Sequence, residues 1–178
     1  MKKYLIFFLF LTGCSSIDQT ADNPKFWDLA RFFTSQQEKL SQSKATWQKQ
    51  ITIDEVVEEK EMNQINWVKE LALFQESDLN KTVYQGNVKT VEQSDRTIYQ
   101  ITDPQLPIQR VFIQWDSNRL PKSIVIESAG DNLLYQTKKQ LTAHFVDGNL
   151  VNYQIDTQQK VIGLDPSDVH VKVYKKGA

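Results

Sequence analysis

Cysteine and histidine are nearly missing from this chain of 178 residues, which has one cysteine, Cys14, and two histidines. A single cysteine excludes an intramolecular disulfide and every zinc motif built from CxxC pairs. GxGxxG, P-loop, HExxH and GxSxG motifs are also absent, so no common pattern for nucleotide binding or hydrolysis is present. No apolar run reaches the roughly 20 residues that a membrane-spanning helix needs.

Charge of either sign gives no indication of a polyanionic partner. The chain has 21 basic and 22 acidic residues, for a formal net charge of −1, and both signs are interspersed along the sequence. Proteins that bind nucleic acid or anionic lipid usually concentrate basic residues on one face or in one run. The composition therefore predicts no nucleic-acid partner.

The first residues form a short apolar run that ends at the only cysteine. Lys2 and Lys3 precede the apolar and aromatic residues 4–11, and Leu11-Thr12-Gly13-Cys14 follows. The run is about half as long as a transmembrane helix and has no polar face, which is typical of an export signal. Its last four residues resemble the lipobox of bacterial lipoproteins. The resemblance implies that Cys14 receives a diacylglyceryl group, that cleavage precedes Cys14, and that the new amino terminus is acylated.

The resemblance sets the expected organisation and location of the chain. Residues 1–13 are the expected signal peptide, 14–23 a lipidated tether, and 24–178 one globular domain. Loss of Lys2 and Lys3 with the signal would change the net charge from −1 to −3. Ser15, rather than aspartate, follows Cys14, which in enteric lipoproteins resembles outer-membrane sorting. We therefore expect a protein of the cell envelope, lipid-anchored in the outer membrane and facing the periplasm.

Two amphipathic helices are expected before a long series of strands. Asn23 suits a helix N-cap and Pro24 a first helical position, and apolar residues then follow at helical spacing to Leu40. A second short helix fits residues 66–76, where Trp67, Leu71 and Phe74 share one face.

Residues 45–53, and the chain from residue 82 onward, alternate with a period of two between turn signals. The expected turns lie at residues 94–95, 117–118, 129–131, 147–148 and 165–168. On the long strand that starts at Leu133, we expect Leu133, Tyr135 and Leu141 on the apolar face. The sequence thus predicts an α+β domain. Its antiparallel meander has about seven or eight strands in a strongly curved sheet, and the N-terminal helix and the second short helix cover one face.

Few residues are candidates for chemistry. His144 and His170 fall on strand positions that alternate with apolar ones, so both are expected to face solvent rather than a catalytic cleft. Glu58, Glu59 and Glu61 fit a solvated strand or helix edge, and Asp165 and Asp168 fit a turn better than a metal pair. We expect no catalytic residue, no bound metal and no cofactor.

Large aromatic residues leave two interpretations open. The five candidates, each either a core residue or a ligand contact, are Trp27, Phe33, Trp47, Trp67 and Trp115. Packing between helices and sheet is the simpler expectation. The alternative is an apolar cavity for an acyl chain, in an arrangement similar to the half-barrel of lipoprotein carriers, a similarity of architecture alone.

The expected function is that of a non-enzymatic binding or assembly component of the envelope, anchored to the membrane through Cys14. Its expected partner is an envelope protein or lipid. A carrier that binds an acyl chain or a lipoprotein is the first alternative, and a hydrolase with an unrecognised carboxylate or histidine site is the second. A carrier predicts a dry internal cavity, a binding protein a filled core with an exposed apolar patch, and a hydrolase a histidine beside a carboxylate in a polar cleft.

Overall fold

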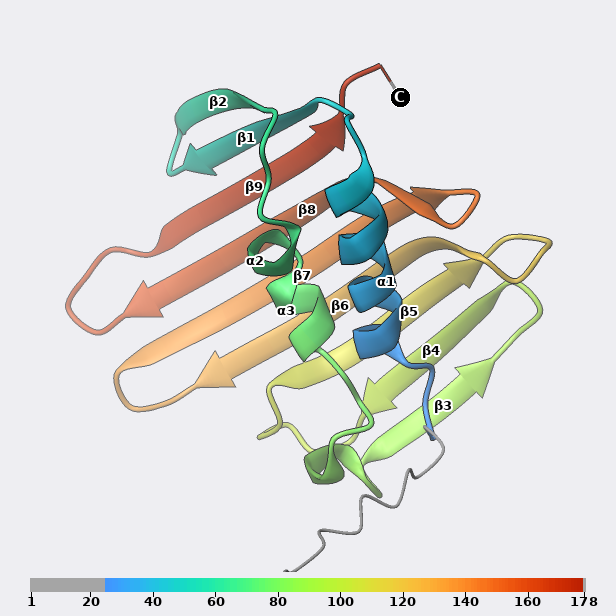
Figure 1. Cartoon of the computed structure of the whole chain (residues 1–178). Coiled ribbons are helices and arrows are strands. Elements are labelled where there is room, and N and C mark those ends of the chain that lie inside the picture. Colours follow the sequence, from blue (N-terminus) through green and yellow to red (C-terminus); the bar gives the residue numbers. More distant parts are fainter. Residues whose placement is uncertain (1–24, 178) are drawn as a thin grey trace, which may run out of the picture.

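The structure is a computed structural model that describes residues 25–177 of the chain. Three α-helices and a two-stranded hairpin open this part, and a series of strands completes it (Figure 1). The elements in chain order are α1 (Leu29–Gln42), β1 (Trp47–Ile53), β2 (Val56–Met62), α2 (Trp67–Glu70), α3 (Ala72–Glu76), the 3-10 turn η1 (Thr82–Tyr84), β3 (Val88–Glu92), β4 (Arg96–Ile101), β5 (Ile108–Trp115), β6 (Pro121–Asp131), β7 (Tyr135–Val146), β8 (Asn149–Val161) and β9 (Ser167–Lys175).

All nine strands of the described residues form one antiparallel sheet. Its order is β2-β1-β9-β8-β7-β6-β5-β4-β3, so the meander β3 to β9 is continuous and the β1–β2 hairpin adds beside the last strand. The sheet is open, with β2 and β3 at its edges. The prediction of a mostly antiparallel α+β domain is confirmed. The strand number exceeds the expected seven or eight, and residues 56–62 form a strand rather than a helix edge.

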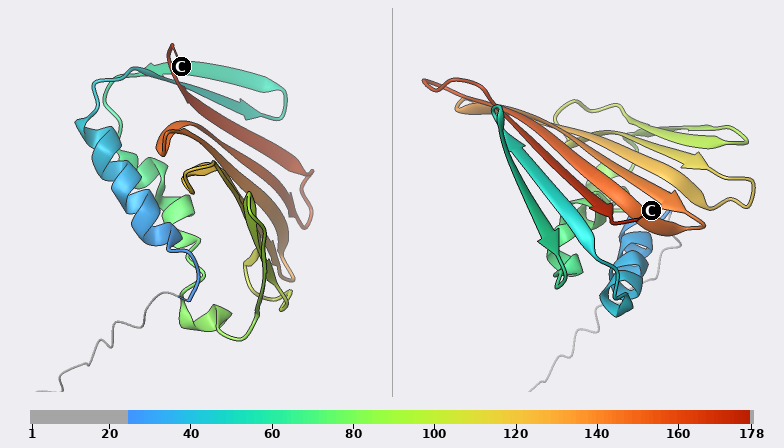
Figure 2. Two further views of the ribbon diagram at one scale, coloured as in Figure 1. Left: turned by 90° about the vertical axis from the view of Figure 1, so that its right-hand side faces the viewer. Right: turned by 90° about the horizontal axis from the view of Figure 1, so that it is seen from above.

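The apolar core lies between one face of the sheet and the helices. Figure 2 shows α1, α2 and α3 on the same side of the strands. Phe33 of α1 lies 6.2 Å from Phe145 of β7, measured between ring centroids, and Phe74 of α3 lies 5.9 Å from Tyr153 of β8. Strand alternation produces this face, because Leu141, Ala143 and Phe145 are buried while the residues between them point to the other side.

Helix α1 begins later than its sequence predicts. The expected start at Pro24 lies outside the described residues, but residues 25–28 are not helical, and Asp28 is the N-cap with its side chain accepting from Arg31 N at 2.8 Å. The backbone N–H groups of Phe26 and Trp27 donate to distant side chains instead. Tertiary hydrogen bonds thus replace the first predicted turn of helix.

The expected helix at residues 66–76 is present as two short helices. Asn66 caps α2 by accepting from Lys69 N at 3.1 Å, and Leu71, with φ −100° and ψ 7°, separates α2 from α3. Trp67, Leu71 and Phe74 are all buried, as their spacing predicts. The interruption therefore leaves the apolar face of the segment intact.

Predicted strand boundaries are wrong at two turns. Ser167 and Asp168 were expected in a turn but begin β9. Residues 129–131 were expected to form a turn but belong to β6, where Ala129 pairs with Lys138 of β7. The turn follows at residues 132–134, so Leu133 precedes β7 and is exposed, and Tyr135 at the start of β7 is exposed as well. The hairpin at Asp147-Gly148 is present as expected, with positive φ at both residues.

Candidate functional site

Three of the five candidate aromatic residues belong to one continuous chain of rings in the core. Trp115 contacts Trp27 at 5.3 Å between centroids, and Trp27 contacts Phe32 at 4.8 Å. Phe32 then contacts Phe33, which stacks on Phe74 at 4.9 Å. These edge-to-face and offset contacts are the geometries that aromatic rings prefer when they pack. Phe33 and Trp115 are therefore buried residues of the hydrophobic core.

Trp27 also lines an open cleft beside the start of α1. The cleft has a volume of about 640 Å³, and Lys25, Arg31, Glu92 and Arg119 contribute charged groups to its walls. The indole N–H of the nearby Trp115 is not available to a ligand, because it donates to Thr97 Oγ1 at 2.9 Å. The charges are of mixed sign, so the cleft has no clear preference for a ligand.

The other two candidate residues form a separate pair. Trp47 of β1 and Trp67 of α2 meet edge to face at 4.9 Å, and both are buried. The pair joins the second helix to the hairpin that adds beside β9. Both rings therefore have a packing role.

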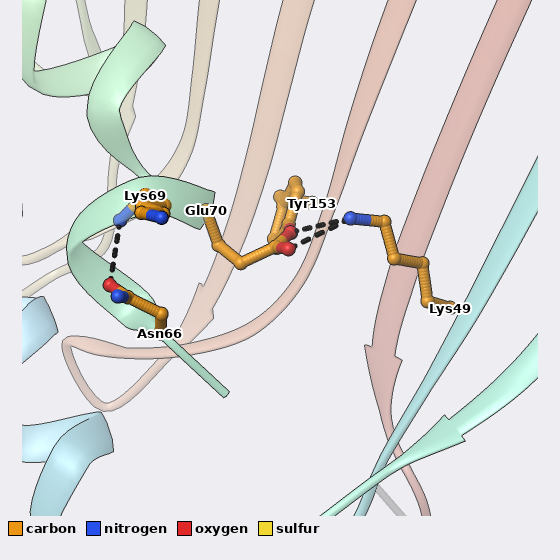
Figure 3. Close-up of polar contacts among 5 residues, drawn as sticks. All are labelled: Lys49, Asn66, Lys69, Glu70 and Tyr153. Atoms are coloured by element: carbon orange, nitrogen blue, oxygen red, sulfur yellow. Dashed lines mark hydrogen bonds and ion pairs between the residues drawn. The ribbon is translucent and has the colours of Figure 1, made fainter. Parts of the chain in front are cut away.

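A polar cluster lies next to this pair and links α2 to two strands (Figure 3). Lys49 Nζ of β1 donates to both carboxylate oxygens of Glu70, at 2.8 and 2.9 Å. The hydroxyl of Tyr153 on β8 donates to Glu70 Oε2. The three groups satisfy one another, and the part of the chain that the structure describes contains no buried side-chain nitrogen or oxygen without a partner.

Burial raises the pKa of Tyr153, and the hydrogen bond to Glu70 and the charge of Glu70 raise it further. A tyrosine in this state keeps its proton and acts as a hydrogen-bond donor, not as a base. Because every polar atom of the cluster is already engaged, we interpret it as a support for α2 rather than as a catalytic site.

On the opposite face of the sheet, a histidine lies against a carboxylate. His170 Nδ1 lies 2.6 Å from Asp156 Oδ1, across the β8–β9 pair. Both line a groove of about 470 Å³ that also includes Glu127, Lys138 and Gln140. A histidine held by a carboxylate can act as a general base. Within residues 25–177, however, no hydroxyl is hydrogen-bonded to the His170 ring.

The remaining candidates do not join this groove. His144 is exposed opposite Ser123 and Asn152, and the structure thus places it apart from His170, on the polar face where its position predicts it. Asp168 N, at the start of β9, donates to Asp54 Oδ1 in the β1–β2 turn at 3.0 Å. Glu58, Glu59 and Glu61 lie on β2 and are exposed. No group of three potential metal ligands occurs in the described ranges. Cys14 lies outside the described residues.

Three neighbouring hairpin ends carry exposed apolar side chains that the sequence analysis missed. They lie at one end of the sheet (Figure 1), and hydrogen bonds connect them. Ile162 N donates to Leu134 O at 3.0 Å, and Asp54 N donates to Asp168 O at 3.1 Å. We define the hairpin-tip surface by Ile53, Val56, Val57, Leu133, Leu134, Tyr135, Ile162 and Leu164.

The most exposed members of the hairpin-tip surface are aliphatic. Leu133 is 90% exposed, Leu134 70%, Ile162 73% and Leu164 67%. Large apolar side chains are common on protein surfaces one by one, but a group of them marks an interaction site. The available sequence signal was the presence of leucines and isoleucine beside turn residues such as Asn132 and Gly163.

Known proteins give no further guidance for this chain. It matches no model of a protein family, and a search of curated proteins finds no similar sequence. In residues 25–177, no helix combines the length and the hydropathy needed to cross a bilayer. The function must therefore be argued from the residues and their geometry.

Proposed function

We propose that this chain is a lipid-anchored protein of the cell envelope that acts by binding, as a non-enzymatic component whose interaction surface is the hairpin-tip surface. The Leu11-Thr12-Gly13-Cys14 sequence supports the anchor, and Ser15 supports the outer membrane and the periplasmic side as its location. The described domain would then follow a link of about ten residues after Cys14. Its partner is an envelope protein or lipid, and the next subsection argues for one of them.

The hairpin-tip surface is the single observation that carries this proposal. Burial of one Leu or Ile side chain contributes about 1.5–3 kcal/mol, so four such side chains can drive a substantial association. Their exposure is otherwise unfavourable for a protein in water, because it promotes aggregation. A binding role explains why Leu133, Leu134, Ile162 and Leu164 lie together at one end of the sheet.

The carrier alternative has less support. A sheet that curves around helices on its concave side, as Figure 2 suggests for this chain, is the arrangement that such carriers use. A carrier also needs an empty apolar space between the two layers. Here the ring of Phe74 contacts both Phe33 of α1 and Tyr153 of β8, so aromatic rings bridge the two layers.

A hydrolase is the second candidate, because one observation favours it. His170 and Asp156 have the spacing of a base and the carboxylate that orients it, and they line a groove. Against this function, the groove lies on an open sheet face, and a nucleophile hydrogen-bonded to His170 is missing from the described residues. The groove thus lacks two features that hydrolytic sites need.

The two functions can be separated in a strain that lacks the gene and is complemented with variants. We expect the combined variant Leu134→Ser and Leu164→Ser to lose complementation, and the combined variant His144→Ala and His170→Ala to complement fully. Val83→Ser and Val146→Ser together are the matched control, because both valines are exposed elsewhere. The opposite pattern, with loss in a folded histidine variant alone, would favour the hydrolase. The amounts of membrane-bound protein must be equal in all strains.

A further inference from the structure

We propose that the hairpin-tip surface enters the headgroup region of the bilayer that holds the Cys14 anchor, and that its partner is therefore zwitterionic lipid rather than a protein. This inference rests on the proposed function, since it assumes the anchor at Cys14. It adds a second, non-covalent contact, which would fix the orientation of the domain on the membrane.

The kinds of side chain on the hairpin-tip surface fit lipid better than protein. Protein–protein hot spots are enriched in Trp, Tyr and Arg, and leucine and valine are under-represented among them. Proteins that bind at the bilayer interface instead present aliphatic side chains with a few aromatic rings at the level of the headgroups. The aliphatic side chains here are Leu133, Leu134, Ile162 and Leu164, and the aromatic ring is that of Tyr135.

The backbone holds these side chains in place. Asn132 Oδ1 accepts from Leu134 N at 2.8 Å and from Tyr135 N at 3.0 Å, and Ile162 N donates to Leu134 O. The two hairpin ends are thus joined, and their backbone groups are engaged with each other. Both properties favour insertion, because ordered groups lose little entropy on binding and engaged amides cost less to remove from water.

The length of the chain before the domain is compatible with this contact. Residues 15–24 link Cys14 to the described structure and can extend to roughly 33–36 Å at about 3.3–3.6 Å per residue. The longest strand, β8, has 13 residues and is therefore about 43 Å long. The domain begins near Trp27, which packs on Trp115 at the end of the sheet opposite the hairpin tips, so the contact requires a nearly extended link or a sheet that tilts toward the bilayer.

The charges near the hairpin-tip surface select the type of lipid. Carboxylates outnumber ammonium groups there. The acidic residues of the three turns and adjoining strand ends are Asp54, Glu55, Asp131, Asp165 and Asp168, and the lysines that line the pockets there are Lys138 and Lys160. Anionic lipid would repel these carboxylates. The contact should therefore form on neutral or zwitterionic lipid and should not weaken when salt is added.

The test uses the full chain, processed and lipidated in cells, with one added cysteine. Lipidation consumes the thiol of Cys14, so the added residue is the only free thiol for a polarity-sensitive fluorophore. The variants are Leu134→Cys and Leu164→Cys. Val146→Cys is the matched control, because Val146 is 58% exposed at the opposite end of the strand that begins beside Leu134. The probe membranes are vesicles of phosphatidylethanolamine and phosphatidylcholine, with and without brominated acyl chains.

The expected result is a blue shift of the two tip fluorophores and loss of their emission with brominated lipid, at low and high salt alike. The fluorophore at position 146 should show neither change. Interfacial groups lie about 5–10 Å into the headgroup and acyl boundary, where bromine on the upper acyl chain can quench them.

Three results would overturn the inference. If the tip fluorophores behave like the one at position 146 while the protein stays on the vesicles, the hairpin-tip surface does not enter the bilayer. The lipid anchor at Cys14 is not contradicted by that result. If they are shielded from an aqueous quencher only in native envelopes, without quenching by bromine, their partner is a protein. If mass spectrometry finds Cys14 unmodified and the protein leaves the vesicles, the proposed function fails together with the inference.

Discussion

At the scale of single residues, Glu70 has the most consequential environment in the described chain. Its carboxylate accepts from Lys49 and from the buried hydroxyl of Tyr153, and these two partners come from different strands. Each member depends on the others, because removal of one leaves a half-buried polar group without its partner. A short helix such as α2 has little stability of its own, so this cluster and the Trp47–Trp67 pair hold it on the sheet.

The raised pKa of Tyr153 predicts a loss of stability at high pH. Below its ordinary value of 10.0, the folded and unfolded chains both keep the proton. Above that pH only the unfolded chain releases it, so the free energy of unfolding falls by about 1.4 kcal/mol per pH unit for this one group. Tyr153→Phe should remove this part of the slope, measured by urea unfolding between pH 9 and 11.

Tyr84 and Tyr99 serve as an internal control for that experiment. Burial also raises the pKa of both tyrosines, so a decline of stability above pH 10 should persist in Tyr153→Phe with a smaller slope. Equal slopes in the two proteins would show that Tyr153 ionises as easily in the folded chain as in the unfolded one.

Trp67→Ala should destabilise the fold by about 3–5 kcal/mol, the usual cost of removing a buried large aromatic ring. Trp67 is 4% exposed and contacts Trp47 edge to face. Chemical denaturation measures the change in the free energy of unfolding. Val68→Ala, at the exposed neighbouring position, should change it by no more than about 0.5 kcal/mol. An unchanged midpoint for Trp67→Ala would mean that α2 does not pack on the sheet.

At the scale of elements, helix α1 is attached to the sheet by more than its apolar face. Gln36 is buried, and its amide donates to Gly148 O at 2.9 Å and accepts from Leu150 N at 3.0 Å. It therefore satisfies two backbone groups of the β7–β8 hairpin. Burial of a glutamine is unusual, and this pair of hydrogen bonds is its physical reason.

Gln36→Leu should cost about 2–3 kcal/mol, because it leaves the two buried backbone groups without partners. The similar size of leucine keeps the cavity small, so the loss reports on hydrogen bonds rather than on volume. Hydrogen exchange should become faster at Leu150 N in particular. Gln42→Leu, at an exposed position of the same helix, is the control. It should leave the hydrogen-exchange rate of Leu150 N as it is in the native chain.

The elements also show what the sequence could predict. Alternation of apolar and polar residues predicted the antiparallel sheet and placed His144 and Leu141 on opposite faces, because these are local properties of a strand. The start of α1 is not determined by neighbouring residues alone. It depends on Asn80 and Tyr99, which are 54 and 72 residues away from the backbone groups they bind. No pattern near residue 24 contains that information.

The hairpin-tip surface was missed for a related reason. Leu133 was assigned to the apolar face of a strand because it shares its parity with Leu141, and a period of two cannot show where pairing stops. β6 continues through Asp131, so the turn moves to residues 132–134 and the leucines move to the end of the sheet. An error of a few residues in a boundary thus changed a predicted core residue into a candidate binding residue.

At the scale of the whole molecule, the two edges of the open sheet differ from its hairpin ends. Edge strand β2 carries Glu58, Glu59, Lys60 and Glu61, and charges on an edge discourage pairing with another chain. The most exposed apolar side chains, Leu133, Leu134, Ile162 and Leu164, lie instead in two of the turns. Edge strand β2 is therefore protected against pairing with another chain, while the end of the sheet that carries the hairpin-tip surface is open to contact.

The anchor gives the last prediction, because both proposals depend on it. Cys14→Ala should abolish lipid attachment and also cleavage, since the thioether forms at the cysteine sulfur and, in the lipoproteins that the lipobox resembles, processing follows lipidation. Uncleaved precursor should then collect in the membrane fraction, held by residues 4–11. Ser15→Ala keeps the thiol and should be lipidated and cut normally. Mass spectrometry of the purified proteins distinguishes the forms. A native chain that is cleaved before Cys14 but carries an unmodified thiol would contradict the anchor, because a single covalent lipid chain already binds only marginally and none would then be present.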